Sequence, residues 1–138
     1  MRSAQPVMLV DDDAVDAMTV KRAFEDLGLA HPLVHVTDGE RALAYLRETS
    51  NPKPAFVLLD LNMPKMNGIE FLRVVKADQT WKGIRIIVLT TSGDRQDVGS
   101  SYAHGAAGYF IKPVGYAEFV ETVRTIQRYW TLCRRPIT

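Results

Sequence analysis

Five short, largely apolar runs constrain the fold of this chain more than any other feature of its sequence. They lie at residues 7–10, 33–36, 56–59, 84–89 and 109–111. Apolar runs of this length, bounded by turn residues, are typical of strands buried in a parallel sheet. The segments between them carry apolar residues at helical spacing, as Val20, Phe24 and Leu27 do before Gly28. The pattern predicts an α/β protein in which strands and helices alternate.

Alternation of five strands with five helices and short connections predicts a flavodoxin-like (βα)5 fold. This is a doubly wound parallel sheet with strand order 2-1-3-4-5. A length of 138 residues fits one domain. We expect residues 1–138 to form that single domain, with a core at about 7–129 and a C-terminal extension at 130–138.

Charge and cysteine content exclude several functional classes. The formal net charge is +1, which gives no electrostatic reason to expect binding to nucleic acid or to a membrane. The single cysteine, Cys133, excludes an internal disulfide framework and fits a reducing compartment. No signal peptide or apolar run of spanning length is present. We therefore expect a cytoplasmic protein.

Polar residues follow four of the five predicted strands. They are Asp11 and Asp12 after the first, Asp60 after the third, Thr90 after the fourth and Lys112 after the fifth. In the predicted strand order the first and third strands are neighbours, so the three acids converge at one edge of the sheet. Two carboxylates repel by about 4 kcal/mol at ~4 Å and an effective dielectric of ~20, a cost that a divalent cation removes. Oxygen ligands without nearby His or Cys favour Mg²⁺ over zinc.

The same edge carries the groups that phosphoryl transfer needs. A carboxylate is a nucleophile towards phosphorus and forms an aspartyl-phosphate. Such transfer depends on charge neutralisation and positioning, which a cation, the Lys112 ammonium and the Thr90 hydroxyl would supply. Asp60 is the predicted nucleophile, whereas Asp13 is predicted to cap the first helix. His31, His35 and His104 show no metal-ligand spacing and are assigned no chemistry.

Several segments, taken in order, resemble the receiver domain of two-component response regulators. They are Val10-Asp11-Asp12, Leu59-Asp60-Leu61-Asn62-Met63-Pro64 with Gly68, the strand-end Thr90, and Gly108-Tyr109-Phe110-Ile111-Lys112-Pro113. The resemblance covers Val7 to about Tyr129 and implies a role for each matching residue. Asp60 would be the phosphoacceptor, and Mg²⁺ would be held by Asp11, Asp12, Asp60 and the Asn62 backbone carbonyl. Lys112 and Thr90 would contact the phosphoryl group, and Thr90 and Tyr109 would form the switch. Pro113 would follow a cis peptide bond, and Asn62 and Ser92 would tune the phosphoryl lifetime.

By the same resemblance, the protein would take its phosphoryl group from a sensor histidine kinase. Its only catalysis would be Mg²⁺-dependent self-phosphorylation and slow autodephosphorylation, so we do not expect an enzyme. Output would pass to a downstream protein target or a phosphorelay partner. The 89–92 run, the Ser101-Tyr102 pair and Tyr129-Trp130 also resemble small response regulators associated with bacterial phytochromes. That similarity implies a bacteriophytochrome kinase and a homodimer formed through the fourth helix, fifth strand and fifth helix.

Two further segments carry predictions about movement and pairing. The helix expected at 94–104 contains Gly99, which costs roughly 1 kcal/mol relative to Ala, so we expect it to shift when Asp60 is phosphorylated. Beyond the usual end of the fold, Trp130, Leu132 and Cys133 would either cap the core or cover a partner's last helix. We favour the homodimer, because Tyr129 and Trp130 are adjacent on the helix and cannot both face the same core.

Three other functions fit parts of the pattern. A haloacid-dehalogenase-type phosphatase needs a second acid two residues after its nucleophile, where this chain has Asn62. A flavin-binding module needs Ser, Thr and Gly after the first strand, where this chain has three acids. An inactive receiver used as a scaffold is disfavoured, because no residue of the expected site is missing.

Overall fold

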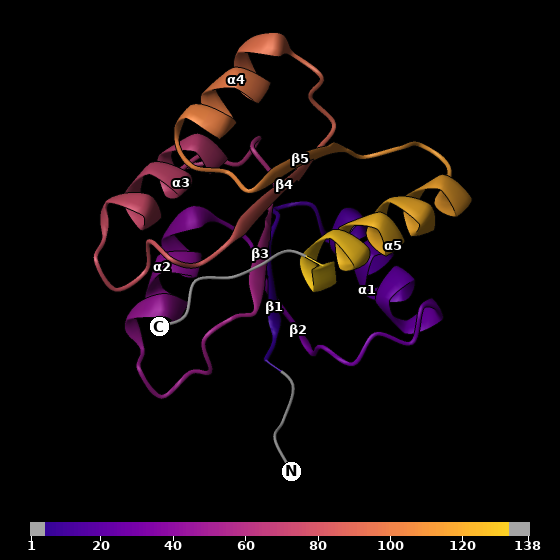
Figure 1. Cartoon of the computed structure of the whole chain (residues 1–138), viewed down its shortest axis with the longest axis horizontal. Helices are drawn as coiled ribbons and strands as arrows, with labels where there is room; N and C mark the ends of the chain where they lie inside the picture. The colour runs from indigo at the N-terminus through magenta and orange to yellow at the C-terminus, as the bar shows by residue number, and fades with distance from the viewer. Residues whose placement is uncertain (1–4, 133–138) are drawn as a thin grey trace.

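The computed structural model describes residues 5–132 and confirms the predicted α/β fold (Figure 1). Its elements are β1 (Val7–Val10), α1 (Ala14–Asp26), β2 (Leu33–Val36), α2 (Gly39–Arg47), β3 (Phe56–Leu59), α3 (Gly68–Ala77), β4 (Ile86–Thr90), α4 (Arg95–Ala103), β5 (Gly108–Ile111) and α5 (Tyr116–Leu132). The strands pair in parallel in the order β2-β1-β3-β4-β5. Helices α1 and α5 cover one face of the sheet, and α2, α3 and α4 lie on the other side (Figure 1).

Burial on both faces explains why the strands are continuous apolar runs. Every residue of β1, β3 and β4 is buried, whereas the edge strands β2 and β5 are only partly buried. Alternate residues of β1 enter separate cores. Val7 and Leu9 pack on the side of α1 and α5, while Met8 and Val10 pack on the side of α2 and α3. Such alternation places both cores around the three central strands and holds the strand ends rigidly.

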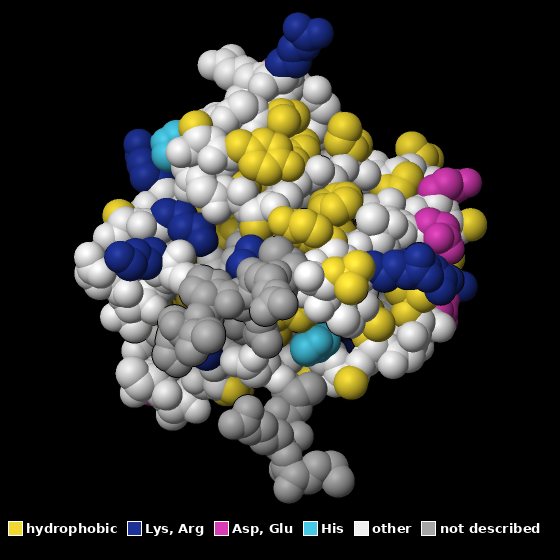
Figure 2. Space-filling view, in the orientation of Figure 1, with side chains coloured by type: hydrophobic (Ala, Val, Ile, Leu, Met, Phe, Trp, Pro, Cys, Tyr) yellow, Lys and Arg dark blue, Asp and Glu magenta, His cyan; other side chains and the backbone are white. Residues whose placement is uncertain are grey.

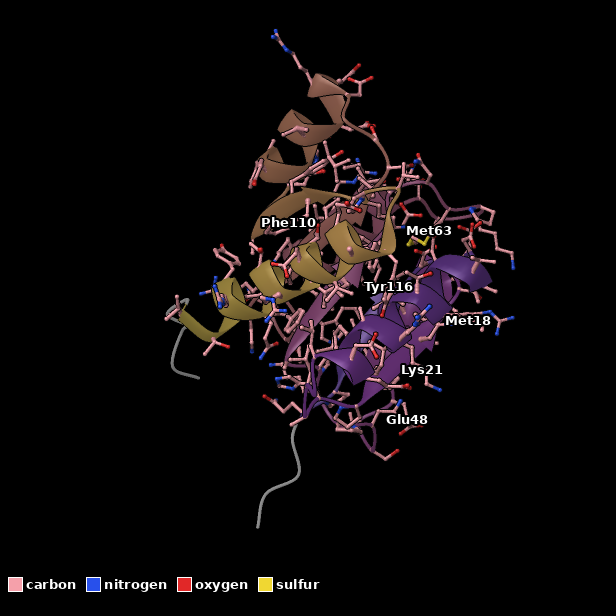
Figure 3. The ribbon with its side chains drawn as sticks, turned by 90° about the vertical axis from the view of Figure 1, so that its right-hand side faces the viewer. Met18, Lys21, Glu48, Met63, Phe110 and Tyr116 are labelled. Carbon is pink, nitrogen blue, oxygen red and sulfur yellow. The ribbon has the colours of Figure 1, made fainter. Side chains whose placement is uncertain are left out.

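Helix α1 begins and ends at the residues that the sequence indicated. The Asp13 carboxylate accepts hydrogen bonds from the backbone N–H groups of Val15 and Asp16, which confirms Asp13 as the N-cap. After the helix, Gly28 adopts a φ of 64°, a conformation that costs glycine little. Helix α1 runs beside α5, where the Tyr116 hydroxyl donates to Asp26 (Figure 3).

The end of α5 completes the core on the α1 side. The Trp130 ring packs against Phe56 with 4.9 Å between ring centroids, and only 8% of Trp130 is exposed. Trp130 therefore caps the core, the first of the two predicted alternatives. Leu132 is exposed, and Cys133 lies outside the described residues. Within residues 5–132 no helix has the length and apolar character to cross a membrane. The predicted cytoplasmic location stays a prediction.

Helix α4 is held weakly, which leads to a first testable expectation. Among its residues only Ser101 is buried, and a Cβ added at Gly99 would meet nothing within 4 Å. We expect Gly99→Ala to raise the free energy of unfolding by about 0.5–1 kcal/mol, because alanine loses less backbone entropy than glycine in a helix. Urea unfolding measures the gain, and amide exchange locates it in α4. Gly28→Ala, at positive φ, is the matched control and should destabilise. Unchanged exchange in α4 would contradict the expectation.

Candidate functional site

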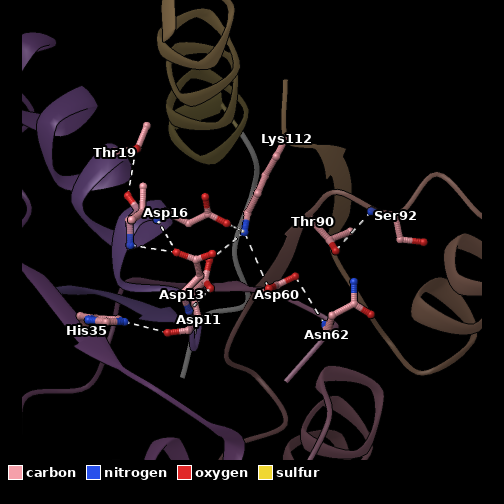
Figure 4. Close-up of polar contacts among 11 residues, drawn as sticks. Asp11, Asp13, Asp16, Thr19, His35, Asp60, Asn62, Thr90, Ser92 and Lys112 are labelled. Carbon is pink, nitrogen blue, oxygen red and sulfur yellow. Dashed lines mark hydrogen bonds and ion pairs between the residues drawn. The ribbon is translucent and has the colours of Figure 1, made fainter. Parts of the chain in front are cut away.

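The ends of β1, β3, β4 and β5 bring the four predicted strand-end positions to one edge of the sheet (Figure 4). Their backbones are still held by the sheet: the Asp11 N–H donates to Val36, the Asp60 N–H to Val10, and the Lys112 N–H to the Thr90 carbonyl. These bonds fix the direction in which each side chain leaves its strand. The strand order and the backbone bonds at the strand ends therefore determine which side chains meet in the site.

Three carboxylates gather at this edge, as the sequence predicted. One oxygen from each of Asp11, Asp12 and Asp60 lies within 4.8 Å of the other two. Asp11 and Asp60 are buried, whereas Asp12 is exposed. Two such charges 4.8 Å apart repel by about 3.5 kcal/mol at an effective dielectric of ~20, and solvent screening reduces this for the pairs that contain Asp12. An all-oxygen set of closely spaced anions suits a hard divalent cation, so the residues present fit such an ion.

Lys112 is the cation of the site and contacts three acids (Figure 4). Its Nζ lies 2.7 Å from Asp11 Oδ2 and 2.8 Å from Asp16 Oδ2. The Asp60 Oδ2 atom is farther away, at 3.7 Å. Burial alone would lower the pKa of Lys112, but the hydrogen bonds to Asp11 and Asp16 outweigh it and raise the pKa. Lys112 therefore stays protonated and partly neutralises the cluster.

Burial has the larger effect on Asp11, whose side chain is 0% exposed. Desolvation raises the pKa of Asp11, while the hydrogen bonds from Lys112 and from the Asp13 N–H oppose that rise. The nearby charge of Asp60 raises it further. A neighbouring cation therefore helps Asp11 to remain ionised.

Thr90 and Tyr109 meet through Ser92. The Thr90 Oγ1 accepts a weak hydrogen bond of 3.4 Å from the Ser92 N–H, and the Tyr109 hydroxyl donates to the Ser92 carbonyl at 2.7 Å. The Ser92 hydroxyl in turn donates to Asp97 Oδ2 at 2.6 Å. Asp97 lies in the first turn of α4. Ser92 therefore joins the predicted switch residues to the start of the weakly held helix.

Gly68 lets α3 begin directly against Asp60. A Cβ at Gly68 would lie 2.6 Å from the Asp60 carbonyl oxygen and 2.7 Å from Leu61 Cα. Between them, the Asn62 N–H makes a long contact of 3.5 Å with Asp60 Oδ1, and the Asn62 residue is exposed. The role of the Asn62 carbonyl as a metal ligand stays a prediction.

The predicted cis peptide bond before Pro113 is wrong. The described residues contain no cis peptide bond, so Lys112 and Pro113 are joined in trans. The local sequence does not decide the isomer, because X-Pro bonds accept both and favour trans by about 0.5–1 kcal/mol. Each of the three histidine rings forms a hydrogen bond with a backbone carbonyl, that of Gln5 for His31, Asp11 for His35 and Ser100 for His104.

Sequence reasoning missed Asp16. This residue stands three positions after the N-cap Asp13, where an acid commonly stabilises the start of a helix. The helix-start pattern does not predict the bond from Lys112 to Asp16, because Lys112 is 96 residues away along the chain. Only the packing of α1 beside the end of β5 brings the two groups together.

Comparison with known proteins identifies the family. Residues 7–124 match the response regulator receiver domain. The chain is 37% identical over 127 residues to the probable methanogenesis regulatory protein FilR2 of Methanothrix harundinacea, covering 90% of this chain and 82% of FilR2. It is 32% identical over 128 residues to the response regulator Rcp1 of Synechocystis, covering 90% of this chain and 87% of Rcp1.

Two solved structures share the fold over nearly its whole length. The phosphorylated cyanobacterial phytochrome response regulator RcpA superimposes with a TM-score of 0.88 at 33% identity, covering 97% of this chain and 99% of RcpA. The Mn²⁺-bound form of Rcp1 gives a TM-score of 0.86 at 30% identity, covering 96% of this chain and 99% of Rcp1. With the fold, the acidic pocket and the sequence match in agreement, the chain belongs to the response regulator receiver domain family.

Proposed function

We propose that this receiver domain works as a switch that is phosphorylated on Asp60. The observation that carries the proposal is the meeting of Asp60 with two further acids and Lys112 at the ends of separate strands. In the reaction, an Asp60 carboxylate oxygen attacks phosphorus while the bond from phosphorus to the donor breaks. With a phosphohistidine donor, the broken bond is phosphorus to nitrogen, and the imidazole leaves as the free histidine side chain.

The proposed metal is Mg²⁺, held by Asp11, Asp12, Asp60 and the Asn62 backbone carbonyl. The all-oxygen donor set supports this choice, as does the crystal structure of Rcp1 in a Mn²⁺-bound form. When bound, the cation would neutralise charge on the transferred group. The Lys112 ammonium would pair with one phosphoryl oxygen, and the Thr90 hydroxyl would donate a hydrogen bond to another. Such catalysis is confined to the protein's own phosphorylation and dephosphorylation.

The proposed response runs from Thr90 to α4. Movement of Thr90 towards the phosphoryl group would break its bond with the Ser92 N–H, and Ser92 also holds Tyr109 and Asp97. Asn62 and Ser92, each two residues beyond a site residue, are the positions proposed to tune the phosphoryl lifetime. Amide exchange in 94–104 with and without beryllofluoride tests the movement, and identical exchange would rule it out.

The proposed phosphodonor is a sensor histidine kinase of the bacteriophytochrome type. Its support is the similarity to RcpA, a phytochrome response regulator, and to two bacteriophytochrome response regulators. Mixing the purified protein with such a kinase under red and far-red light, and following phosphoryl transfer, tests the pairing. Transfer from unrelated histidine kinases alone would contradict it. The downstream protein target would read the α4-β5-α5 surface.

We also propose that the α4-β5-α5 surface pairs two copies of the chain. Figure 2 shows hydrophobic side chains gathered between α4 and α5, where β5 forms the edge of the sheet. On these elements Tyr102 of α4, Ile111 of β5 and Val114 just after β5 are exposed hydrophobic residues. Their burial in a homodimer would remove apolar surface from water. Analytical ultracentrifugation that finds only monomer, with and without beryllofluoride, would refute the pairing.

Acetyl phosphate and Mg²⁺ test the proposed function. We expect a retarded band on a Phos-tag gel for the wild-type chain, lost when EDTA replaces Mg²⁺ and absent in Asp60→Ala. Asp12→Asn removes an exposed acid of the cluster. We expect this variant to need a higher Mg²⁺ concentration for phosphorylation, with Asp60 still the residue that is modified. An equal band in Asp60→Ala would overturn the assignment.

Stabilisation by Mg²⁺ is expected to shrink as the pH falls. An ion present at 100 times its Kd stabilises the fold by about 2.7 kcal/mol, provided that its ligands are ionised. Burial raises the pKa of Asp11 above its ordinary value of 3.8, so protons compete with Mg²⁺ from a higher pH than for an exposed aspartate. In the metal-free protein the sign is opposite: Asp11 contributes stability at low pH that is lost as the pH rises through its raised pKa. Thermal unfolding with Mg²⁺ or EDTA across this range measures both trends, and a Mg²⁺ effect independent of pH would contradict them.

A further inference from the structure

The two short hydrogen bonds of Lys112 avoid the residue that the proposed function makes the phosphoacceptor. Lys112 Nζ donates to Asp11 and Asp16 at 2.7 Å and 2.8 Å, whereas Asp60 Oδ2 lies at 3.7 Å, beyond hydrogen-bond reach. An ammonium group has three N–H donors, so Lys112 has one donor left after its bonds to Asp11 and Asp16. The separation from Asp60 needs a cause, since the two groups carry opposite charge.

Asp16 supplies that cause. Its carboxylate comes from the first turn of α1, outside the group of three acids that could hold a metal ion. In Figure 4, Asp16 and Asp60 lie on different sides of the Lys112 ammonium group. The Lys112 side chain is only 5% exposed, so the ammonium group is shielded from water, although the Asp16 side chain is 36% exposed. A charge-assisted bond in such a place is strong enough to fix the ammonium group.

We propose that Asp16 is a positioning residue that holds the Lys112 ammonium away from Asp60, so that the Asp60 carboxylate stays free for the metal ion and for attack on phosphorus. This inference rests on the proposed function. The Asp16 carboxylate bonds Lys112 and is not one of the three acids grouped as a possible metal site, so in this proposal it acts through Lys112. Without it, Lys112 would keep Asp11 and close onto Asp60, occupying an oxygen that the cation needs.

Asp16→Ala and Asp16→Asn separate this role from a general effect of charge. Both variants remove the same negative charge, but the asparagine oxygen still accepts a bond from Lys112. We expect Asp16→Ala to weaken Mg²⁺ binding to the unphosphorylated protein by about tenfold, the scale of one charged hydrogen bond, with Asp16→Asn closer to wild type. Glu25→Gln, which neutralises an exposed acid on the same helix, is the matched control. Equal losses in both Asp16 variants would overturn the proposal.

A double-mutant cycle with Lys112 supplies the readout that a purely structural Asp16 would not move. In a Lys112→Met background, Asp16→Ala should have no further effect on Mg²⁺ affinity, because no ammonium remains to be held. If Asp16 merely stabilised the start of α1, its effect would be the same in both backgrounds, and the proposal would be wrong.

The crystal structure of metal-free Asp16→Ala keeps the proposal open to refutation even if the Lys112 variant does not fold. The distance from Lys112 Nζ to Asp60 Oδ2 should fall from 3.7 Å to hydrogen-bond length. An unchanged distance would refute the inference. Both readouts use the unphosphorylated protein, so they judge this inference separately: absence of phosphorylation on wild-type Asp60 would instead defeat the proposed function.

Discussion

Lys112→Ala is expected to lower the free energy of unfolding of the metal-free protein by about 3–5 kcal/mol, the usual cost of leaving a buried charge without its partner. Asp11, which is 0% exposed, would lose its 2.7 Å ion pair while three carboxylates remained together. A bound divalent cation would replace part of the lost charge. Excess Mg²⁺ should therefore stabilise this variant more than it stabilises the wild type.

Urea unfolding in EDTA and in Mg²⁺ measures both effects. Lys21→Ala is the matched control, because Lys21 is exposed on α1 (Figure 3) and its loss should change stability little. Adding Asp11→Asn to Lys112→Ala should recover much of the loss by removing the unpaired charge. A loss below about 1 kcal/mol in EDTA would show that the ion pair contributes no more than a surface pair does.

Gly68→Ala is expected to damage both the fold and the site, although it changes neither charge nor polarity. Its Cβ would stand 2.6 Å from the Asp60 carbonyl oxygen, which is backbone and cannot turn aside. We expect a loss of about 2–3 kcal/mol, at the upper end of the range for overpacking, as α3 is pushed away from the end of β3. Displacement of Asp60 should also slow its phosphorylation by acetyl phosphate.

Another glycine provides the control for the Gly68 experiment. A Cβ at Gly83 would meet nothing within 4 Å, so Gly83→Ala should not affect the site. Urea unfolding measures the loss of stability, and the rate of modification by acetyl phosphate measures the effect on Asp60. Wild-type behaviour of Gly68→Ala in both assays would mean that α3 and the 60–68 segment adjust without strain.

The positions of the site residues at strand ends were predictable from the sequence. A parallel strand buried on both faces leaves an uninterrupted apolar run, and the first polar residue after the run marks its carboxyl end. Asp11, Asp60 and Lys112 follow from this rule, and the strand order then brings them together. The N-cap Asp13 was predictable for a local reason, because a capping bond spans only two or three residues.

Contacts set by packing between distant segments were not predictable. The bond of Asp16 to Lys112 depends on how α1 lies against the end of β5. The bond of Ser92 to Asp97 depends on the path of the loop before α4. Burial of Trp130 depends on Phe56 as its neighbour, a contact that the sequence does not mark, and the sequence favoured a partner's helix over the core. The trans bond before Pro113 is a small energetic preference that no residue pattern marks.

Chemical trapping of the phosphorylated residue tests the central claim most directly. Borohydride reduces an aspartyl-phosphate to homoserine, releasing phosphate, so the modified position is recorded in the peptide itself. After incubation of the wild-type chain with acetyl phosphate and Mg²⁺, followed by borohydride and peptide mass spectrometry, we expect homoserine at position 60. Homoserine at Asp11 or Asp12 instead, or unmodified Asp60 in a protein that still binds Mg²⁺, would contradict the account.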